Sequence, residues 1–165
     1  MATTALKGTP VQTNSDLPAV GSAAPDFLLV GVDLSEKSLA DFAGKKKILT
    51  INPSYDTGIC QAAARTFNQR AAGLDDVVVL VVSADLPFAQ KRFCVAEGLE
   101  GVVPLSTFRG SFLDDYGVRL LDSAMKDLAA RAIVVLDENN QVVHTELVAD
   151  IGQEPNYDAA IAAVK

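Results

Sequence analysis

The chain has 165 residues, of which 49% are hydrophobic and 21% are charged. This composition is typical of one globular domain with a buried core and excludes a disordered or fibrous chain, so we predict a single domain over residues 1–165. The formal charge is −7 and the longest basic run is Lys45-Lys46-Lys47, so no nucleic-acid partner is expected.

The sequence also argues against several other classes of protein. It begins without the basic start and apolar run of a secretory signal peptide, and the apolar stretch Val77–Val82 is too short to span a bilayer. We therefore expect a soluble, cytoplasmic protein with no membrane partner. Two cysteines and one histidine make a poor zinc set, and no glycine-rich phosphate loop is present, so neither a metal nor a nucleotide cofactor is expected.

Patterning predicts an α/β fold. The first 25 or so residues, rich in Gly and Pro, predict an irregular or hairpin-like extension. Strands are predicted at Lys47–Asn52, Val77–Val82, Val102–Phe108, Arg131–Leu136 and Gln141–Val148. Helices are predicted from Thr57 to about Leu74 and at Pro87–Leu99, Ser111–Tyr116 and Asn156–Val164. The last two strands form a hairpin around residues 137–140. This order describes a mixed central sheet flanked by helices, which fits a thioredoxin-like fold.

Cys60 lies in a pattern that favours a reactive thiol. Pro53 ends the preceding strand, and Asp56 or Thr57 can cap the next helix, which places Cys60 in its first turn. The free N–H groups and the positive dipole end there favour a thiolate, which is the nucleophilic form. Thr57 lies one turn earlier, so its hydroxyl is expected to reach the sulfur or an atom approaching it.

The same spacing also allows a purely structural cysteine. At about 100° per residue, Cys60 shares the apolar face of its helix with a set of small and large hydrophobic residues. These are Ala63, Ala64, Phe67, Ala71 and Leu74. A packed core cysteine is therefore the alternative, and the position of Cys60 at a helix start after a proline-terminated strand is what favours reactivity.

Two longer motifs surround the cysteines. The spacing Pro53-x-x-x-Thr57-x-x-Cys60 is similar to the active-site signature of the peroxiredoxins. The longer string Pro-Ser-x-Asp-Thr-x-x-Cys, together with the segment Ser83–Cys94, resembles the thiol peroxidase subfamily of the atypical two-cysteine type. Shorter matches follow at residues 106–109, 115–118 and 130–134, so the resemblance covers nearly the whole chain.

This resemblance implies roles for individual residues. Cys60 would be the peroxidatic cysteine, Thr57 would hydrogen-bond the peroxide and the thiolate, and Pro53 would shield the pocket from water. Arg131 would hold the thiolate and polarise the peroxide; without the resemblance it would be interpreted as an ordinary charge at a strand end. Displacement at oxygen places negative charge on both the attacking sulfur and the leaving oxygen, and a fixed cation with amide donors stabilises that charge.

The resemblance also implies a catalytic cycle. Cys94 would be the resolving cysteine and would form an intramolecular disulfide with Cys60, which thioredoxin would reduce. The implied substrates are hydrogen peroxide and organic hydroperoxides, and the implied assembly is a homodimer. The pair Gly58-Ile59 and the stretch Leu121–Asp127 depart from the subfamily pattern. The latter is expected near the mouth of the pocket, where it would affect the size of substrate accepted.

The helical phase of Cys94 gives a separate prediction. On the predicted helix, the apolar stripe consists of Phe88, Arg92, Val95 and Leu99, which leaves Cys94 on the wetter side with Gln90, Lys91, Glu97 and Gly98. Free cysteines are mostly buried, so a cysteine off the apolar face favours a redox role. Because the two cysteines lie on separate helices, a disulfide between them requires local unwinding.

Two other functions remain open from the residues alone. One is a thiol–disulfide oxidoreductase that acts on protein disulfides, which the absence of a C-x-x-C pair disfavours. The other is a non-enzymatic domain with incidental thiols, which the position of Cys60 at a helix start disfavours.

Overall fold

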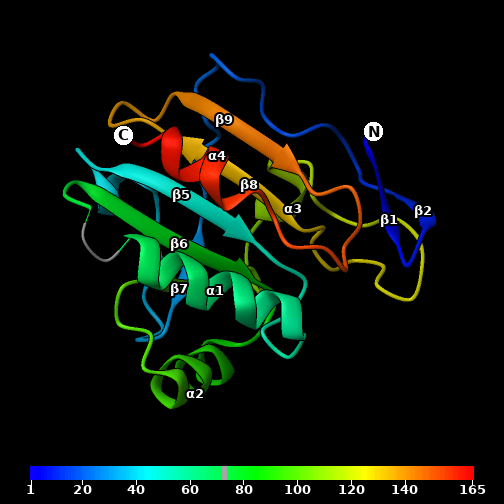
Figure 1. Cartoon of the computed structure of the whole chain (residues 1–165), viewed down its shortest axis with the longest axis horizontal. Helices are drawn as coiled ribbons and strands as arrows, with labels where there is room; N and C mark the ends of the chain where they lie inside the picture. The colour runs from blue at the N-terminus through cyan, green and yellow to red at the C-terminus, as the bar shows by residue number, and fades with distance from the viewer. Residues whose placement is uncertain (72–73) are drawn as a thin grey trace.

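A computed structural model, which describes residues 1–71 and 74–165, contains a seven-stranded mixed sheet with helices on both faces (Figure 1). From edge to edge the strands are β4 (Glu36–Lys37), β3 (Leu29–Gly31), β7 (Val103–Ser106), β6 (Val77–Ser83), β5 (Lys46–Ile51), β8 (Ala132–Leu136) and β9 (Val142–Leu147). Strands β5, β6 and β7 are parallel neighbours, and the other pairs are antiparallel. The predicted mixed sheet flanked by helices is confirmed.

The central strands are covered on both faces because their side chains alternate between two cores. On β5, Ile48 packs in a core with α1 (Gly58–Ala71) and α4 (Tyr157–Ala162). The adjacent Leu49 points to the other core, which includes residues of α3 (Phe112–Asp115) and of the 3-10 helix η1 (Leu39–Phe42). In Figure 1, α1 and α4 lie in front of the sheet and α3 lies behind it. A β-branched run such as that of β6 suits this position between two cores.

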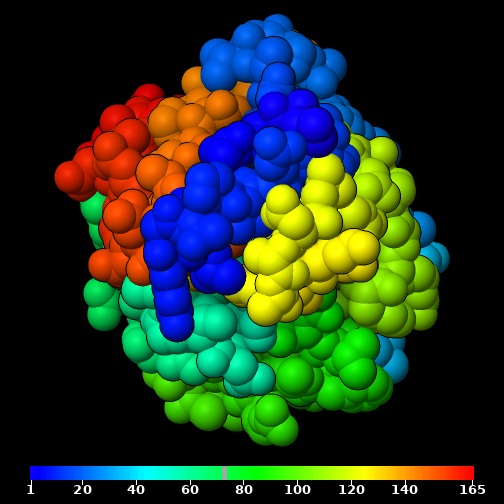
Figure 2. Space-filling model, turned by 90° about the vertical axis from the view of Figure 1, so that its right-hand side faces the viewer, coloured from blue at the N-terminus to red at the C-terminus, as the bar shows by residue number. Residues whose placement is uncertain are grey.

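The N-terminal extension is a hairpin, as predicted. Strands β1 (Thr3–Leu6) and β2 (Thr9–Gln12) pair across a turn at Lys7 and Gly8, both of which have positive φ, as a tight hairpin turn requires. Val11 of β2 packs with Leu120, Ala130 and Ile151. Figure 2 shows the hairpin in dark blue beside the yellow segment around residue 120, above the teal start of α1. The hairpin therefore covers the end of the sheet at which α1 begins.

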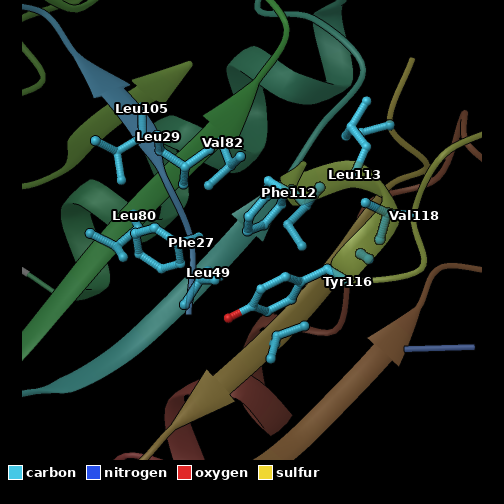
Figure 3. Close-up of a cluster of buried hydrophobic side chains, with 14 of the residues drawn as sticks. Phe27, Leu29, Leu49, Leu80, Val82, Leu105, Phe112, Leu113, Tyr116 and Val118 are labelled. Carbon is cyan, nitrogen blue, oxygen red and sulfur yellow. The ribbon is translucent and has the colours of Figure 1, made fainter. Parts of the chain in front are cut away.

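Aromatic side chains fix the opposite face of the sheet. The rings of Phe112 and Tyr116 stack with centroids 4.4 Å apart, and Phe27 meets Phe112 edge to face at 6.0 Å. The hydroxyl of Tyr116 donates to the carbonyl of Pro25 at 2.7 Å. Figure 3 shows these rings over Leu49 and its neighbours in the sheet. This cluster ties the chain before β3 to the segment around α3.

The boundaries of the predicted elements differ from the structure in a few places. The helix predicted from Thr57 begins at Gly58, and its last described residue is Ala71; residues 72–73 of the prediction lie outside the described residues. The helix α2 (Pro87–Glu97) ends at Gly98, which adopts the left-handed conformation of a helix C-cap. Sequence patterns did not indicate β4 or η1, because both are too short for a hydrophobic period. Among the described residues, no helix is long and apolar enough to cross a membrane.

Candidate active site

The site lies where two parallel strands end. β5 and β6 are hydrogen-bonded in register from Lys46–Val77 to Ile51–Val82, so their carboxyl ends meet at one edge. The chain after β5 leads into α1, and the chain after β6 leads into α2. In open α/β sheets this edge is where functional loops gather. The topology therefore brings both cysteine-bearing helices to the same end of the sheet.

Cys60 is the third residue of α1 and is 1% exposed. The carbonyl of Thr57 accepts from the amide of Gln61 at 3.2 Å, so the helical bonds begin at Thr57 and Cys60 lies in the first turn. The first amides of a helix have no partner within the helix and carry its positive dipole end. A guanidinium nitrogen of Arg131 lies 3.1 Å from the sulfur. The sulfur of Cys60 therefore lies beside a fixed guanidinium and at the start of a helix.

Arg131 is buried and is held in a fixed orientation. It is 2% exposed, its Nε donates to the carbonyl of Ile151 at 2.8 Å, and one terminal nitrogen donates to Oδ1 of Asn52 at 3.0 Å. In the part of the chain that the structure describes, none of the ion pairs involves Arg131. A buried cation without a carboxylate is costly, and a neighbouring thiolate offsets that cost. The geometry therefore pairs Arg131 with Cys60 rather than with an acid.

Thr57 and Pro53 flank the cysteine in the loop between β5 and α1. Pro53 is buried and Thr57 is half-buried. The hydroxyl of Thr57 donates to the carbonyl of Ser54 at 3.1 Å, so its hydrogen is directed to the loop rather than to the sulfur of Cys60. Its oxygen lone pairs remain able to accept a hydrogen bond from the O–H of a bound hydroperoxide.

Cys94 lies on the inward face of α2, and the prediction that it lies on the wetter face is wrong. Cys94 shares the buried face with Pro87 and Gln90, whereas Phe88 is 68% exposed and Val95 is 74% exposed. The helix takes this phase because the side-chain nitrogen of Gln90, although polar, is bonded inside: it donates to Oγ of Ser83 at 3.1 Å and to the carbonyl of Leu105 at 3.0 Å. Hydrophobicity alone therefore gave the wrong phase.

Burial changes the chemistry of Cys94. Its environment raises its pKa from 9.0 to about 11 because burial disfavours the thiolate. In the folded protein Cys94 is therefore a neutral thiol at physiological pH. Both cysteines are free. Because Cys94 is buried, the local unwinding expected from the sequence stays a prediction about how its sulfur would become accessible.

Tyr55 and Asp85 join the two cysteine-bearing segments. Tyr55 is 3% exposed, and its ring packs against Phe93 with centroids 4.8 Å apart. The pKa of the Tyr55 phenol is raised well above its usual value. Burial is the largest cause, and the nearby Cys94, Asp85 and Cys60 raise it further. The carboxylate of Asp85 accepts from the amide of Tyr55 at 2.7 Å. Tyr55 thus lies between the loop before α1 and helix α2, next to both cysteine-bearing segments.

The segment Leu121–Asp127 packs against the N-terminal hairpin. The amide of Leu121 donates to the carbonyl of Gln12 at 2.9 Å, and the carboxylate of Asp122 accepts from the amide of Gln12 at 3.1 Å. Met125 packs against the cluster of Val11, Leu120, Ala130 and Ile151. Because Ile151 also accepts the bond from Arg131, this segment and the hairpin support the chain that orients the guanidinium.

Sequence reasoning missed Asn52 and Asp85 as residues of the site. Asn52 is 1% exposed and directly follows β5, and Asp85 follows β6 by two residues. The available signal was the rule that the carboxyl ends of neighbouring parallel strands meet at one edge. That rule would have placed together the polar residues at and just beyond the ends of the two predicted strands, Lys47–Asn52 and Val77–Val82.

Comparisons with known proteins agree with this architecture. The family model described as Redoxin matches residues 19–161. Curated thiol peroxidases from Mycobacterium bovis and Mycobacterium tuberculosis are each 54% identical over 164 residues, which cover 99% of both chains. The crystal structure of a peroxiredoxin-like protein from Aquifex aeolicus, 38% identical, superposes with a TM-score of 0.94 over 99% of this chain and 96% of that chain.

A more distant structure shows the same fold. A thiol peroxidase from Chromobacterium violaceum, 23% identical, superposes with a TM-score of 0.88 over 95% of this chain and 91% of that chain. The predicted thioredoxin-like architecture and the resemblance seen in the cysteine motifs are confirmed. The chain belongs to the redoxin family and, within it, to the thiol peroxidases.

Proposed function

We propose that this chain is a thiol-specific peroxidase that reduces hydrogen peroxide and organic hydroperoxides, with Cys60 as the attacking thiolate. The observation that carries the proposal is the buried Arg131 guanidinium 3.1 Å from the sulfur of Cys60, at the start of α1. A fixed cation and free helix amides around a sulfur stabilise negative charge that develops there and on the leaving oxygen. The same arrangement has no use in a domain whose thiols are only structural.

In the first step the Cys60 thiolate attacks one oxygen of the hydroperoxide. A sulfur–oxygen bond forms as the oxygen–oxygen bond breaks, so the sulfur is oxidised by two electrons to a sulfenic acid. The other oxygen leaves with the electron pair of the broken bond and takes a proton to become water or an alcohol. Arg131 stabilises the negative charge on the attacking sulfur and on the leaving oxygen. Thr57 orients the peroxide by accepting a hydrogen bond from its O–H group. Pro53 is buried within the loop before α1 and keeps bulk water from the sulfur.

In the second step the thiol of Cys94 attacks the sulfenic sulfur of Cys60. A disulfide forms within the chain, and the sulfenic oxygen leaves as water after taking the proton of the Cys94 thiol. A thioredoxin-type dithiol then reduces the disulfide by exchange, becoming oxidised itself as both thiols are restored. Because this cycle depends on a compartment that supplies dithiols, we place the protein in the cytoplasm.

We also propose that the chain forms a homodimer through the outer face of α2. Leu86, Phe88 and Val95 are 52%, 68% and 74% exposed there, and large apolar surfaces of this kind mark protein contacts. Phe88 and Val95 also line an apolar groove together with Lys91, Arg92 and Ala96. Two copies related by a two-fold axis can bury this groove against each other. Sedimentation should show monomers for Phe88→Glu and dimers for the matched edge-strand variant Val143→Glu; a dimeric Phe88→Glu would contradict this interface.

One assay separates the peroxidase from the two other functions. Hydrogen peroxide consumption is followed directly, because the chain has no Trp to report the reaction. We expect a stoichiometric burst with the reduced protein alone and continuous turnover once thioredoxin and its reductase are added. Reduction of protein disulfides without peroxide consumption would identify a thiol–disulfide oxidoreductase. If the protein carries out neither reaction, it is a domain with incidental thiols.

A further inference from the structure

We propose that Asp85 is a positioning residue that sets the balance between disulfide formation and over-oxidation of Cys60. The inference rests on the proposed function, because it concerns the disulfide between Cys60 and Cys94. Asp85 does not contact the sulfur of Cys60. It acts by holding together the two chain segments that must separate before the cysteines can react.

The carboxylate of Asp85 connects the ends of two neighbouring strands. Its Oδ1 accepts from the hydroxyl of Ser54 at 2.7 Å, and its Oδ2 accepts from the amide of Tyr55 and from the hydroxyl of Ser83, both at 2.7 Å. The backbone of Asp85 is itself fixed, because its carbonyl accepts from the hydroxyl of Ser106 at 2.6 Å. One half-buried side chain thus binds the loop that leads to α1 and the strand that leads to α2.

Tyr55 makes this connection relevant to the cysteines. Its amide is held by Asp85, and its ring packs against Phe93, the residue before Cys94. Tyr55 and Cys94 belong to the same buried cluster. Opening α2 around Cys94 therefore disturbs the Tyr55–Phe93 contact, and Asp85 resists any movement of Tyr55. Hydrogen bonds to an ionised carboxylate are about twice as strong as neutral ones, so this resistance is substantial.

The strength of the connection determines the fate of the sulfenic acid. Cys60 sulfenic acid either condenses with Cys94 or reacts with a second peroxide to give sulfinic acid. Only condensation needs the two segments to separate. The bonds that Asp85 accepts from Ser54 and Tyr55, which join the two segments, therefore slow condensation and leave more time for the second peroxide. Weakening Asp85 should shift the balance toward the disulfide.

The test is Asp85→Asn, which keeps the shape of the side chain but removes its charge and one acceptor. The reduced protein is treated with a graded series of hydrogen peroxide, and disulfide and sulfinic acid are separated by intact mass and peptide mapping. We expect the peroxide concentration that gives equal amounts of both to rise about tenfold, the effect of weakening one charge-assisted bond. This ratio is independent of the rate of the first attack, because both products form from the same sulfenic acid.

Three further variants make the result specific. Asp33→Asn removes another carboxylate bonded to a serine, at a distant turn between β3 and β4, and should behave as wild type. Ser54→Ala removes the bond to Oδ1 of Asp85 and the bond that the Ser54 hydroxyl accepts from the amide of Asp56 at 3.1 Å, but keeps both bonds to Oδ2 of Asp85. It should shift the ratio in the same direction by less, which carries the test if Asp85→Asn does not fold. In a Cys94→Ser background, Asp85→Asn should leave the rate of sulfinic acid formation unchanged, because no condensation competes there.

The outcomes distinguish this inference from the function on which it rests. If the wild type forms the Cys60–Cys94 disulfide but the ratio is the same in Asp85→Asn and Ser54→Ala, the role of Asp85 is wrong and the cycle stands. A faster or slower sulfinic acid reaction in the Cys94→Ser background would also overturn it, because Asp85 would then act on the pocket itself. If the wild type forms no such disulfide, the role of Asp85 and the proposed catalytic cycle both fail.

Discussion

The guanidinium of Arg131 lies 3.1 Å from the sulfur of Cys60, although 71 residues separate them in the sequence. The sheet accounts for this contact. β5 and β8 are antiparallel with Ile51 opposite Ala132, so the next residues outward, Asn52 and Arg131, leave the sheet at the same point. Asn52 accepts a bond from Arg131 there, and the chain after Asn52 turns into the helix that carries Cys60. The strand register therefore fixes the position of the cation.

Removing this cation should slow the first step more than any other change that leaves Cys60 in place. Arg131→Met keeps most of the side-chain volume, and we expect the second-order rate constant with hydrogen peroxide to fall about a hundredfold, as on loss of a donor to a developing anion. The rate is measured by competition with a second peroxidase. Arg70→Met, at an exposed ion pair with Asp158, is the control and should react normally. Equal rates in both variants would mean that Arg131 only supports the fold.

Loss of the Thr57 hydroxyl should have a smaller effect in the same assay. Thr57→Val keeps the branched shape but removes the bond to the Ser54 carbonyl and the acceptor for the peroxide. We expect the rate constant to fall about tenfold, less than for Arg131→Met, because neutral hydrogen bonds are weaker than charge-assisted ones. A reversed order of the two variants would show that the hydroxyl, rather than the guanidinium, is the main stabilising group.

Cys94→Ser should separate the two halves of the cycle. Cys60 should still react once with peroxide, and dimedone should trap the resulting sulfenic acid. Thioredoxin-coupled turnover should be lost, because no resolving thiol remains. Oxidised wild-type protein should run as a monomer on non-reducing gels. Covalent dimers, or normal turnover of Cys94→Ser, would place the resolving thiol elsewhere.

The buried thiol of Cys94 should make the stability of the reduced protein depend on pH in the alkaline range. Its pKa is about 11 in the folded chain against 9.0 as the ordinary value, so between these values the unfolded state releases a proton that the folded state keeps. This contribution to stability is fully present below pH 9 and is lost as the pH rises through about 11. Urea midpoints measured from about pH 8 upward should fall more steeply for wild type than for Cys94→Ser. Parallel curves would mean that Cys94 is already accessible to solvent in the folded state.

Local patterns and the family resemblance predicted different parts of this molecule. The β-branched run of β6 and the turn at residues 137–140 predicted their elements correctly, because period and turn chemistry are local properties. No periodicity could bring Arg131 to Cys60; that pairing depends on strand register and was implied only by the resemblance. The phase of α2 was wrong because internal hydrogen bonds bury Gln90 and leave Phe88 and Val95 exposed. Asp85 went unnoticed because its partners come from three separate segments.

The most direct test of the account is the peroxidase activity of Cys60→Ser. The change is nearly isosteric, so circular dichroism and the urea midpoint should report an intact fold. The account predicts that this variant consumes no hydrogen peroxide, either as a burst or in thioredoxin-coupled turnover, while Cys94 stays reduced. Peroxide turnover above a few per cent of the wild-type rate, in a variant with an intact fold, would contradict the assignment of Cys60 as the nucleophile.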